Sequence, residues 1–160
     1  MEINEEVLKF KHPFTCMVAG PTSSGKTVLV RKIIKNYKKL ITFPNGTPDR
    51  LKLIWAYGQR QDMHHIEIGE NIDCNYIPGL PSETEVRHDM PHLIVIDDLM
   101  TELGDHKGLA NLFTKGSHHL NISIIFISQN LFHQGKQMRS IGLNCHYYII
   151  MKNPVIRIEF

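Results

Sequence analysis

One stretch of this sequence limits the possible folds more than any other: Phe14 to Ile34, FTCMVAGPTSSGKTVLVRKII. A short apolar run ends at Gly20, a turn-rich segment follows, and apolar residues then recur at helical spacing. Residues 20–27 match G-x-x-x-x-G-K-[ST] between a predicted strand and a predicted helix, the context in which this pattern forms a phosphate-binding loop. A Gly/Ser turn that only caps an ordinary helix is the alternative.

Each part of the predicted loop (a Walker A motif) suits a bound nucleoside triphosphate. Gly20 and Gly25 reach backbone angles that other residues avoid and let the main chain approach a phosphate. N–H groups of the loop and of the first helical turn face the anion, and the helix dipole favours negative charge there. The Lys26 ammonium is expected to reach the β and γ phosphates, and the Thr27 hydroxyl to bind Mg²⁺. We therefore predict ATP and Mg²⁺ as cofactors, with the nucleotide held by Gly20, Pro21, Thr22, Ser23, Ser24, Gly25, Lys26 and Thr27.

Composition describes an ordinary globular domain. The 160 residues suffice for one domain with a proper core, and the net charge of +2 gives no overall indication of a nucleic-acid partner. The three cysteines are widely spaced and odd in number, which favours reduced thiols in an intracellular protein over a disulfide framework. Apolar runs fall short of the roughly 18–20 residues of a membrane span, so we expect no membrane partner.

The rest of the chain alternates predicted strands with predicted helices. Apolar runs indicate strands at Leu51–Tyr57, His92–Asp97, Asn121–Ser128 and Cys145–Met151, and a short strand at Cys74–Ile77. Helix signals follow the loop, with one buried face at Val30, Ile33, Ile34 and Tyr37, and recur from Ser82, over Lys107–Lys115 and over Lys136–Gly142. Uninterrupted apolar strands are buried on both faces. We therefore expect an open, mostly parallel α/β sheet that binds its ligand at the carboxyl ends of the strands.

Two carboxylates follow one of the apolar runs. In a parallel sheet, Asp97 and Asp98 emerge on the same edge as the phosphate loop. We predict that Asp97 holds Mg²⁺ through water while Thr27 holds it directly, a Walker B arrangement. Asp98 is predicted to orient or deprotonate the attacking water. A strand-end pair that only caps the next turn is the alternative, and Glu102 is a second candidate for the base.

Two polar side chains further on complete a predicted catalytic set of Lys26, Asp98, Gln129 and Arg139. Gln129 closes the next buried strand on the same edge, where its amide can hydrogen-bond the γ-phosphate or the water. Arg139 is a candidate for an arginine given to a neighbouring subunit, where it stabilises charge on the transferring phosphoryl group. A plain polar turn is the alternative for Gln129, and a surface or nucleic-acid contact is the alternative for Arg139.

With these residues, the chain resembles the FtsK–HerA class of P-loop ATPases. More closely, it is similar to the packaging ATPases of Polinton/Maverick elements and adintovirus-like DNA viruses. The matching segments are PFTCMVAGPTSSGKTVLV, HLIVIDDLM, LFTKGSHHLNISIIFISQNLFHQGKQMRSIGLN and HYYIIMKNP. The third segment is more specific than the phosphate loop, which many unrelated NTPases share.

The resemblance implies a three-layer P-loop NTPase of the additional-strand class, with helices on both faces of a sheet of order 5-1-4-3-2. In that order, the strand of Gln129 lies between those of Lys26 and Asp97. The resemblance also implies a ring-shaped homo-oligomer that hydrolyses ATP to move double-stranded DNA into a capsid, with capsid or portal proteins as further partners. Such a protein would act inside the cell, at a virion assembly site or in the host nucleus or cytoplasm.

The family resemblance ends near Lys152-Asn153-Pro154, after which family members carry a basic-acidic pair and a further helix. We therefore expect residues 1–160 to form a single P-loop ATPase domain, C-terminally shortened relative to the family. The shortening bears on ring assembly and DNA translocation rather than on nucleotide binding.

Three hypotheses follow from the sequence. The first is a motor ATPase, for which DNA-stimulated phosphate release without a phosphorylated acceptor would be diagnostic. The second is a small-molecule kinase, but the segments after Gln129 offer only Arg139 and Arg157 for a lid over the phosphates. The third is a truncated domain that binds nucleotide without turnover, for which tight ATP binding without phosphate release would be diagnostic.

Overall fold

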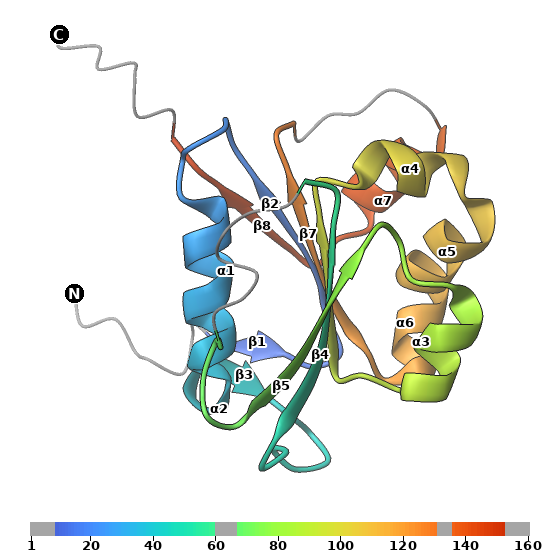
Figure 1. The fold of residues 1–160 in the computed structure, drawn as a ribbon. Coiled ribbons are helices and arrows are strands. Elements are labelled where there is room, and N and C mark those ends of the chain that lie inside the picture. The colour runs from blue at the N-terminus through green and yellow to red at the C-terminus, as the bar shows by residue number, and fades with distance from the viewer. Residues whose placement is uncertain (1–8, 60–66, 131–135, 153–160) are drawn as a thin grey trace, which may run out of the picture.

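In the computed structural model, which describes residues 9–59, 67–130 and 136–152, a six-stranded sheet lies between two layers of helices (Figure 1). Its strands are β2 (Thr15–Ala19), β4 (Leu51–Tyr57), β5 (Ile72–Pro78), β6 (Leu93–Asp97), β7 (Ser123–Ser128) and β8 (Tyr147–Ile150). They lie in the spatial order β5-β4-β6-β7-β2-β8, and every neighbouring pair is parallel. The expected parallel α/β class is confirmed.

The strand order agrees with the expected one except for an added strand. Counted from the phosphate-loop strand, β2, β4, β6, β7 and β8 take places 1 to 5 and give 5-1-4-3-2. The sixth strand, β5, lies outside β4 at the edge, so the sheet is one strand wider than the five-strand order that the resemblance implied. The short strand expected at Cys74–Ile77 is the centre of β5. As the resemblance implied, β7 lies between β2 and β6.

Helices cover both faces of the sheet, as Figure 1 shows. One layer holds α1 (Lys26–Lys35) and α2 (Tyr37–Leu40). The other holds α3 (Glu83–Asp89), α4 (Met100–Asp105), α5 (Lys107–Asn111), the π-helix η3 (Leu112–Gly116), α6 (Ser117–Leu120) and α7 (Lys136–Leu143). Alternate residues of β2 enter different cores: Cys16 and Val18 pack with α1, Met17 and Ala19 with the larger layer. Burial on both faces explains the uninterrupted apolar runs.

Two expected helices are interrupted. The buried face at Val30, Ile33 and Ile34 belongs to α1, but the helix ends at Asn36 and Tyr37 starts the separate α2. The Asn36 side-chain amide donates to the Lys32 carbonyl oxygen (2.8 Å), a local bond that competes with continued helix. The helix expected over Lys107–Lys115 is divided between α5 and η3, where the main chain widens into a π-turn, and helical structure continues through α6. α4 was not predicted.

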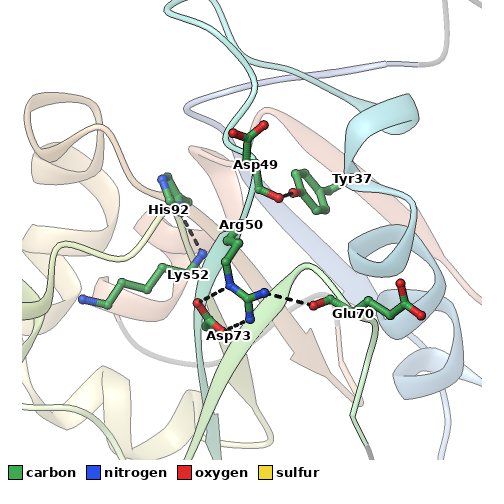
Figure 2. A network of polar contacts seen from close by, with 7 residues as sticks. All are labelled: Tyr37, Asp49, Arg50, Lys52, Glu70, Asp73 and His92. Atoms are coloured by element: carbon green, nitrogen blue, oxygen red, sulfur yellow. Dashed lines mark hydrogen bonds and ion pairs between the residues drawn. The ribbon is translucent and has the colours of Figure 1, made fainter.

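A network of polar contacts holds the added strand β5 in register (Figure 2). The Arg50 guanidinium, just before β4, donates to both carboxylate oxygens of Asp73 on β5 (2.5 and 3.1 Å) and to the Glu70 carbonyl oxygen (3.3 Å). On the other side, the Tyr37 hydroxyl donates to the Asp49 carbonyl oxygen (2.9 Å). Exposed ion pairs contribute little stability, so this network mainly fixes where the start of β4 sits between β5 and α2.

A buried histidine, His12, lies at the amino ends of the strands and contacts the first residue of β7. β1 (Phe10–Lys11) and β3 (Ile41–Thr42) form a separate two-stranded parallel sheet beside the main one. His12 follows β1, and its Nδ1 lies 2.6 Å from the Ser123 hydroxyl, which also accepts the Phe14 N–H (3.0 Å). Burial lowers the pKa of His12 to about 4. Within the described part of the chain, no helix is long and apolar enough to cross a membrane.

Candidate functional site

The carboxyl ends of four adjacent strands meet at one edge of the sheet. Main-chain hydrogen bonds join the loops that follow them: Gly20 N–H to Ser128 O (3.2 Å), Asp98 N–H to Ile127 O (3.2 Å) and Gly58 N–H to Asp97 O (2.9 Å). Because the strands are parallel, this edge collects the residues that follow β2, β7, β6 and β4. The phosphate loop and the aspartate pair are therefore neighbours.

A cavity of about 340 Å³ lies at this edge. Residues 22–28 of the loop and α1 form one wall, Asp97 and Asp98 form another, and residues 127–129 and Gln59 complete it. Six of the eight predicted loop residues, both aspartates and Gln129 thus share one cavity. Gly20 and Pro21 do not line the cavity, but their carbonyl oxygens accept hydrogen bonds from Lys26, which does.

The phosphate loop has the concave main chain that binds anions. Ser23 (φ 63°) and Gly25 (φ 90°) are left-handed, and α1 starts directly after Gly25. Such alternation turns successive N–H groups toward a common centre. The Ser24 hydroxyl oxygen is buried and has no hydrogen-bond partner among the described residues. A buried polar atom without a partner costs free energy, so this loop suits a ligand rich in hydrogen-bonding oxygens.

The Lys26 side chain folds back onto the phosphate loop. Its ammonium donates to the carbonyl oxygens of Gly20 (2.5 Å) and Pro21 (2.9 Å). Burial lowers the pKa of Lys26, and the nearby Asp97 and Asp98 carboxylates oppose this shift. The amine and the two carboxylates therefore lie on the same rim of the sheet, as the sequence predicts.

The two aspartates have different environments although they are adjacent. Asp97 is 3% exposed, and the indole N–H of Trp55 donates to its Oδ2 (3.2 Å). Burial raises the pKa of Asp97 to about 6, against the Trp55 hydrogen bond, which lowers it. Asp98 is exposed and left-handed (φ 57°) and also lines the cavity. The N-cap of α4 is Leu99, whose side chain makes no cap hydrogen bond.

The donor set fits a magnesium-bound nucleotide. Main-chain N–H groups and the Lys26 ammonium suit phosphate oxygens. The Thr27 hydroxyl and the Asp97 carboxylate supply oxygen, which Mg²⁺ prefers, and Mg²⁺ usually keeps waters and binds through one or two carboxylates plus substrate phosphates. Among the residues that the structure describes, no group of three or more His, Cys, Asp or Glu side chains could hold a metal alone. The roles of these residues remain predictions.

Three other polar residues differ in how they relate to the cavity. Gln129 follows β7 and lines the cavity as predicted. Arg139 is exposed on α7 and does not line it, so any catalytic role requires a second subunit and stays a prediction. Glu102, the second candidate for the base, is exposed on α4 and is also outside the lining. Sequence reasoning missed Gln59, although the argument that placed Gln129 applies to any polar residue after a strand of this sheet.

A parallel sheet with a glycine-lysine loop after β2 and a carboxylate at the end of β6 is typical of the P-loop NTPase-like fold. The family model described as "Poxvirus A32 protein" matches residues 2–153. This chain belongs to the poxvirus A32 protein family. The broad resemblance to FtsK–HerA-type ATPases is thereby supported at family level, and the narrower likeness to Polinton/Maverick and adintovirus-like proteins remains a prediction.

The fold is also found in a solved structure. The cytoplasmic domain of EssC superposes with a TM-score of 0.56 at 12% identity, over 86% of this chain and 31% of that chain. This chain therefore spans less than a third of the EssC chain, and at this identity the likeness concerns the fold alone. None of the curated proteins matches this sequence.

Proposed function

We propose that this protein is the ATP-binding and ATP-hydrolysing domain of a viral or transposon-type DNA-packaging motor. The observation that carries the proposal is the single cavity that brings together the phosphate loop, Lys26, the aspartate pair and Gln129. Membership of the poxvirus A32 family, a viral packaging ATPase type, supports it. We further propose a relationship to the Polinton/Maverick and adintovirus-like ATPases.

Catalysis in this proposal depends on position and charge. The loop N–H groups and Lys26 hold the phosphates of ATP, while Thr27 and, through water, Asp97 are the residues that would hold Mg²⁺. Bound Mg²⁺ would neutralise charge on the β and γ phosphates. The exposed Asp98 orients or deprotonates the attacking water, and Gln129 hydrogen-bonds that water or the γ-phosphate. Phosphoryl transfer requires little more from a protein than such positioning and electrostatic stabilisation.

Partners belong to the same proposal. The motor would act as a homo-oligomeric ring on double-stranded DNA, near capsid or portal proteins at a virion assembly site or in the host nucleus or cytoplasm. Arg139 on α7 would serve the site of a neighbouring subunit. Residues 1–160 would form one ATPase domain of that ring.

Three single substitutions test the site. Lys26→Ala should abolish ATP binding or hydrolysis, because Lys26 supplies the only ammonium group among the described residues that line the cavity. Asp98→Asn should keep ATP binding and lower phosphate release at least about hundredfold, the scale of general-base catalysis. Asn also tolerates the left-handed backbone at this position. Glu102→Gln is the matched control: it removes an exposed carboxylate outside the cavity and should change neither quantity.

The results separate the hypotheses. Parent-level turnover in Asp98→Asn would refute the assignment of the base, and loss of turnover in Glu102→Gln instead would transfer that role. A phosphorylated small molecule in place of free phosphate would favour a kinase. Tight ATP binding without phosphate release, even with DNA and at high protein concentration, would favour a domain without turnover.

Subunit mixing tests the role of Arg139. Arg139→Ala should lower turnover alone and regain part of it when mixed with Asp98→Asn subunits, which keep Arg139 but cannot complete their own sites. Phosphate release across mixing ratios measures this, alongside solution mass with and without ATP and DNA. A strict monomer, or no recovery at any ratio, would contradict the ring and the role in trans.

A further inference from the structure

The single tryptophan of the chain lies directly behind the predicted metal side of the cavity. Trp55 on β4 is 0% exposed, and its Nε1–H donates to Oδ2 of Asp97 on the neighbouring strand β6 (3.2 Å). Trp55 pairs with Val95, two residues before Asp97, so the two side chains are diagonal neighbours on one face of the sheet. The large indole spans the diagonal distance and reaches the carboxylate.

Both partners need this bond. An indole N–H is a donor only, so a fully buried one requires an acceptor. A carboxylate that is nine-tenths or more buried requires donors to offset the loss of water. The indole has only two side-chain torsions and is packed on all sides, so it holds the Asp97 carboxylate in a defined orientation where it lines the cavity.

Further contacts fix the indole from behind. Trp55 pairs with Tyr76 on the added strand β5, and their ring centroids are 6.0 Å apart. The Tyr76 hydroxyl accepts a hydrogen bond from Nη1 of Arg31 on α1 (2.7 Å). Arg31 lies one helical turn after Thr27, the residue predicted to bind Mg²⁺ directly. A chain of contacts thus runs from the helix of the phosphate loop through β5 and β4 to the aspartate.

We propose that Trp55 is a positioning residue that orients the Asp97 carboxylate toward a nucleotide-bound divalent cation, and that Tyr76 and Arg31 hold the indole in place. This rests on the proposed function only in its assignment of Asp97 to the metal side. The added strand β5 then has a role at the site although it lies two strands from β6.

The tryptophan itself supplies a test that leaves it intact. A protein with one tryptophan gives one indole N–H resonance in a ¹⁵N-correlated NMR spectrum. Without nucleotide, Asp97→Asn should move this resonance, because the carboxylate acceptor becomes a neutral amide. Tyr37→Phe is the matched control: it removes the hydrogen-bonding hydroxyl of another buried aromatic residue, which donates to the Pro48 and Asp49 carbonyl oxygens, and should leave the resonance in place. An unmoved resonance in Asp97→Asn would overturn the proposal, whether or not the protein binds ATP.

The second test measures the metal. With a non-hydrolysable ATP analogue bound, Mn²⁺ affinity of Trp55→Phe, measured by electron paramagnetic resonance, should fall about tenfold, the lower end of effects seen when a partner behind a metal ligand is lost. Affinity for the analogue without metal should stay within about twofold of the parent, since the loop that binds phosphates is untouched. Tyr37→Phe should change neither affinity. Unchanged Mn²⁺ affinity, or equal loss of both affinities, would overturn the positioning role.

The two proposals fail in different ways. A parent protein that binds no analogue would refute the proposed function, while the resonance of Asp97→Asn would still decide the hydrogen bond. If Trp55→Phe does not fold, the parent decides: its indole resonance should move when Mg²⁺ is added to the analogue complex. No movement on saturation with Mg²⁺ would count against the role of Trp55.

Discussion

Asp98 illustrates how a single backbone conformation sets up the site. Its left-handed φ of 57° turns the chain sharply after the buried Asp97, so that one carboxylate is shielded and the next is exposed in the cavity. Gly58 packs against this turn: a Cβ at Gly58 would lie 2.6 Å from the Asp98 carbonyl oxygen. The turn therefore requires a glycine at the end of the neighbouring strand.

We expect Gly58→Ala to lower ATP turnover by roughly ten- to hundredfold, because the added methyl displaces the turn that carries Asp98. ATP binding should change much less, since the phosphate loop is not contacted. Steady-state phosphate release and equilibrium binding measure the two effects. Gly108→Ala on α5 is the control, because its Cβ would approach no atom closer than 3.4 Å. Turnover as fast in Gly58→Ala as in Gly108→Ala would contradict the argument.

At the scale of single residues, the sequence predicts which functional groups line the cavity better than it predicts their backbone conformations and hydrogen bonds. The loop pattern and the strand-end rule place Lys26, Asp97 and Gln129 at one cavity without any coordinates. The left-handed turn at Asp98 and the indole bond of Trp55 were not predictable, because they depend on which residues of adjacent strands face each other. That register is set by pairing across the sheet rather than by the local pattern.

At the scale of elements, the residue that follows β8 packs against the start of the phosphate loop. The Met151 N–H donates to the Ala19 carbonyl oxygen (2.8 Å), which continues the β2–β8 pairing up to the first residue of the loop. A Cβ at Gly20 would lie 2.7 Å from the Met151 Cβ. Gly20 therefore allows the loop to pack closely against Met151, in addition to the close approach of a phosphate that the loop pattern predicts.

A second-site substitution can test this packing. Gly20→Ala should lower the free energy of unfolding by about 1–3 kcal/mol, the usual cost of overpacking, and should weaken ATP binding. Adding Met151→Gly removes the clashing Cβ and should restore part of both, relative to Met151→Gly alone. Adding Met151→Ala keeps that Cβ and should restore neither. Thermal unfolding and ATP titration measure both effects, and equal rescue by the two second substitutions would argue against this contact.

The elements themselves differ in how far they could be predicted. The other five strands lie within predominantly apolar runs, and β4 has the predicted bounds, Leu51–Tyr57. The edge strand β5 alternates polar Asp73 and Asn75 with residues that face the core, so only its centre was recognised. The break at Asn36 and the π-turn of η3 escaped prediction because apolar periodicity continues across both.

For the whole molecule, the strand order could be anticipated only through the family resemblance. Periodicity and run length indicate parallel strands with helices on both faces, but they contain nothing about which strand lies beside which. The addition of β5 outside β4 depends on main-chain pairing between segments that are distant in the sequence, such as Leu51 with Ile72 and Leu53 with Cys74. No local pattern predicts such a pairing.

In mild acid, the buried His12 should lower the stability of the fold, whereas the raised pKa of Asp97, about 6, acts with the opposite sign below that pH. Burial lowers the pKa of His12 from 6.5 to about 4, so between these values the unfolded chain binds a proton that the native protein excludes. This contribution is fully present above pH 6.5 and decreases as the pH falls toward 4, by at most about 1.4 kcal/mol per pH unit. Burial also lowers the pKa values of His92 and His146, which act with the same sign.

Denaturant unfolding at several pH values measures this dependence. His12→Gln removes one titrating group and should lower the slope of stability against pH between pH 6.5 and 4 by up to one proton. His92, His146 and, with the opposite sign, Asp97 remain and set the residual slope. Curves of equal steepness for parent and His12→Gln would show that His12 keeps an ordinary pKa in the folded protein.

The parallel run of β2 and β8 also determines where attachments to this protein can be placed. The chain enters the sheet beside the first residues of β7 and β8, where His12 contacts Ser123 and the Lys11 N–H donates to the Tyr147 hydroxyl. It leaves at Met151, against Gly20, on the opposite rim. A fluorophore attached at the exposed Lys152 would therefore lie close to the phosphate loop, whereas one attached at the exposed Lys9 would lie on the far rim. Binding measurements should use the label at Lys9.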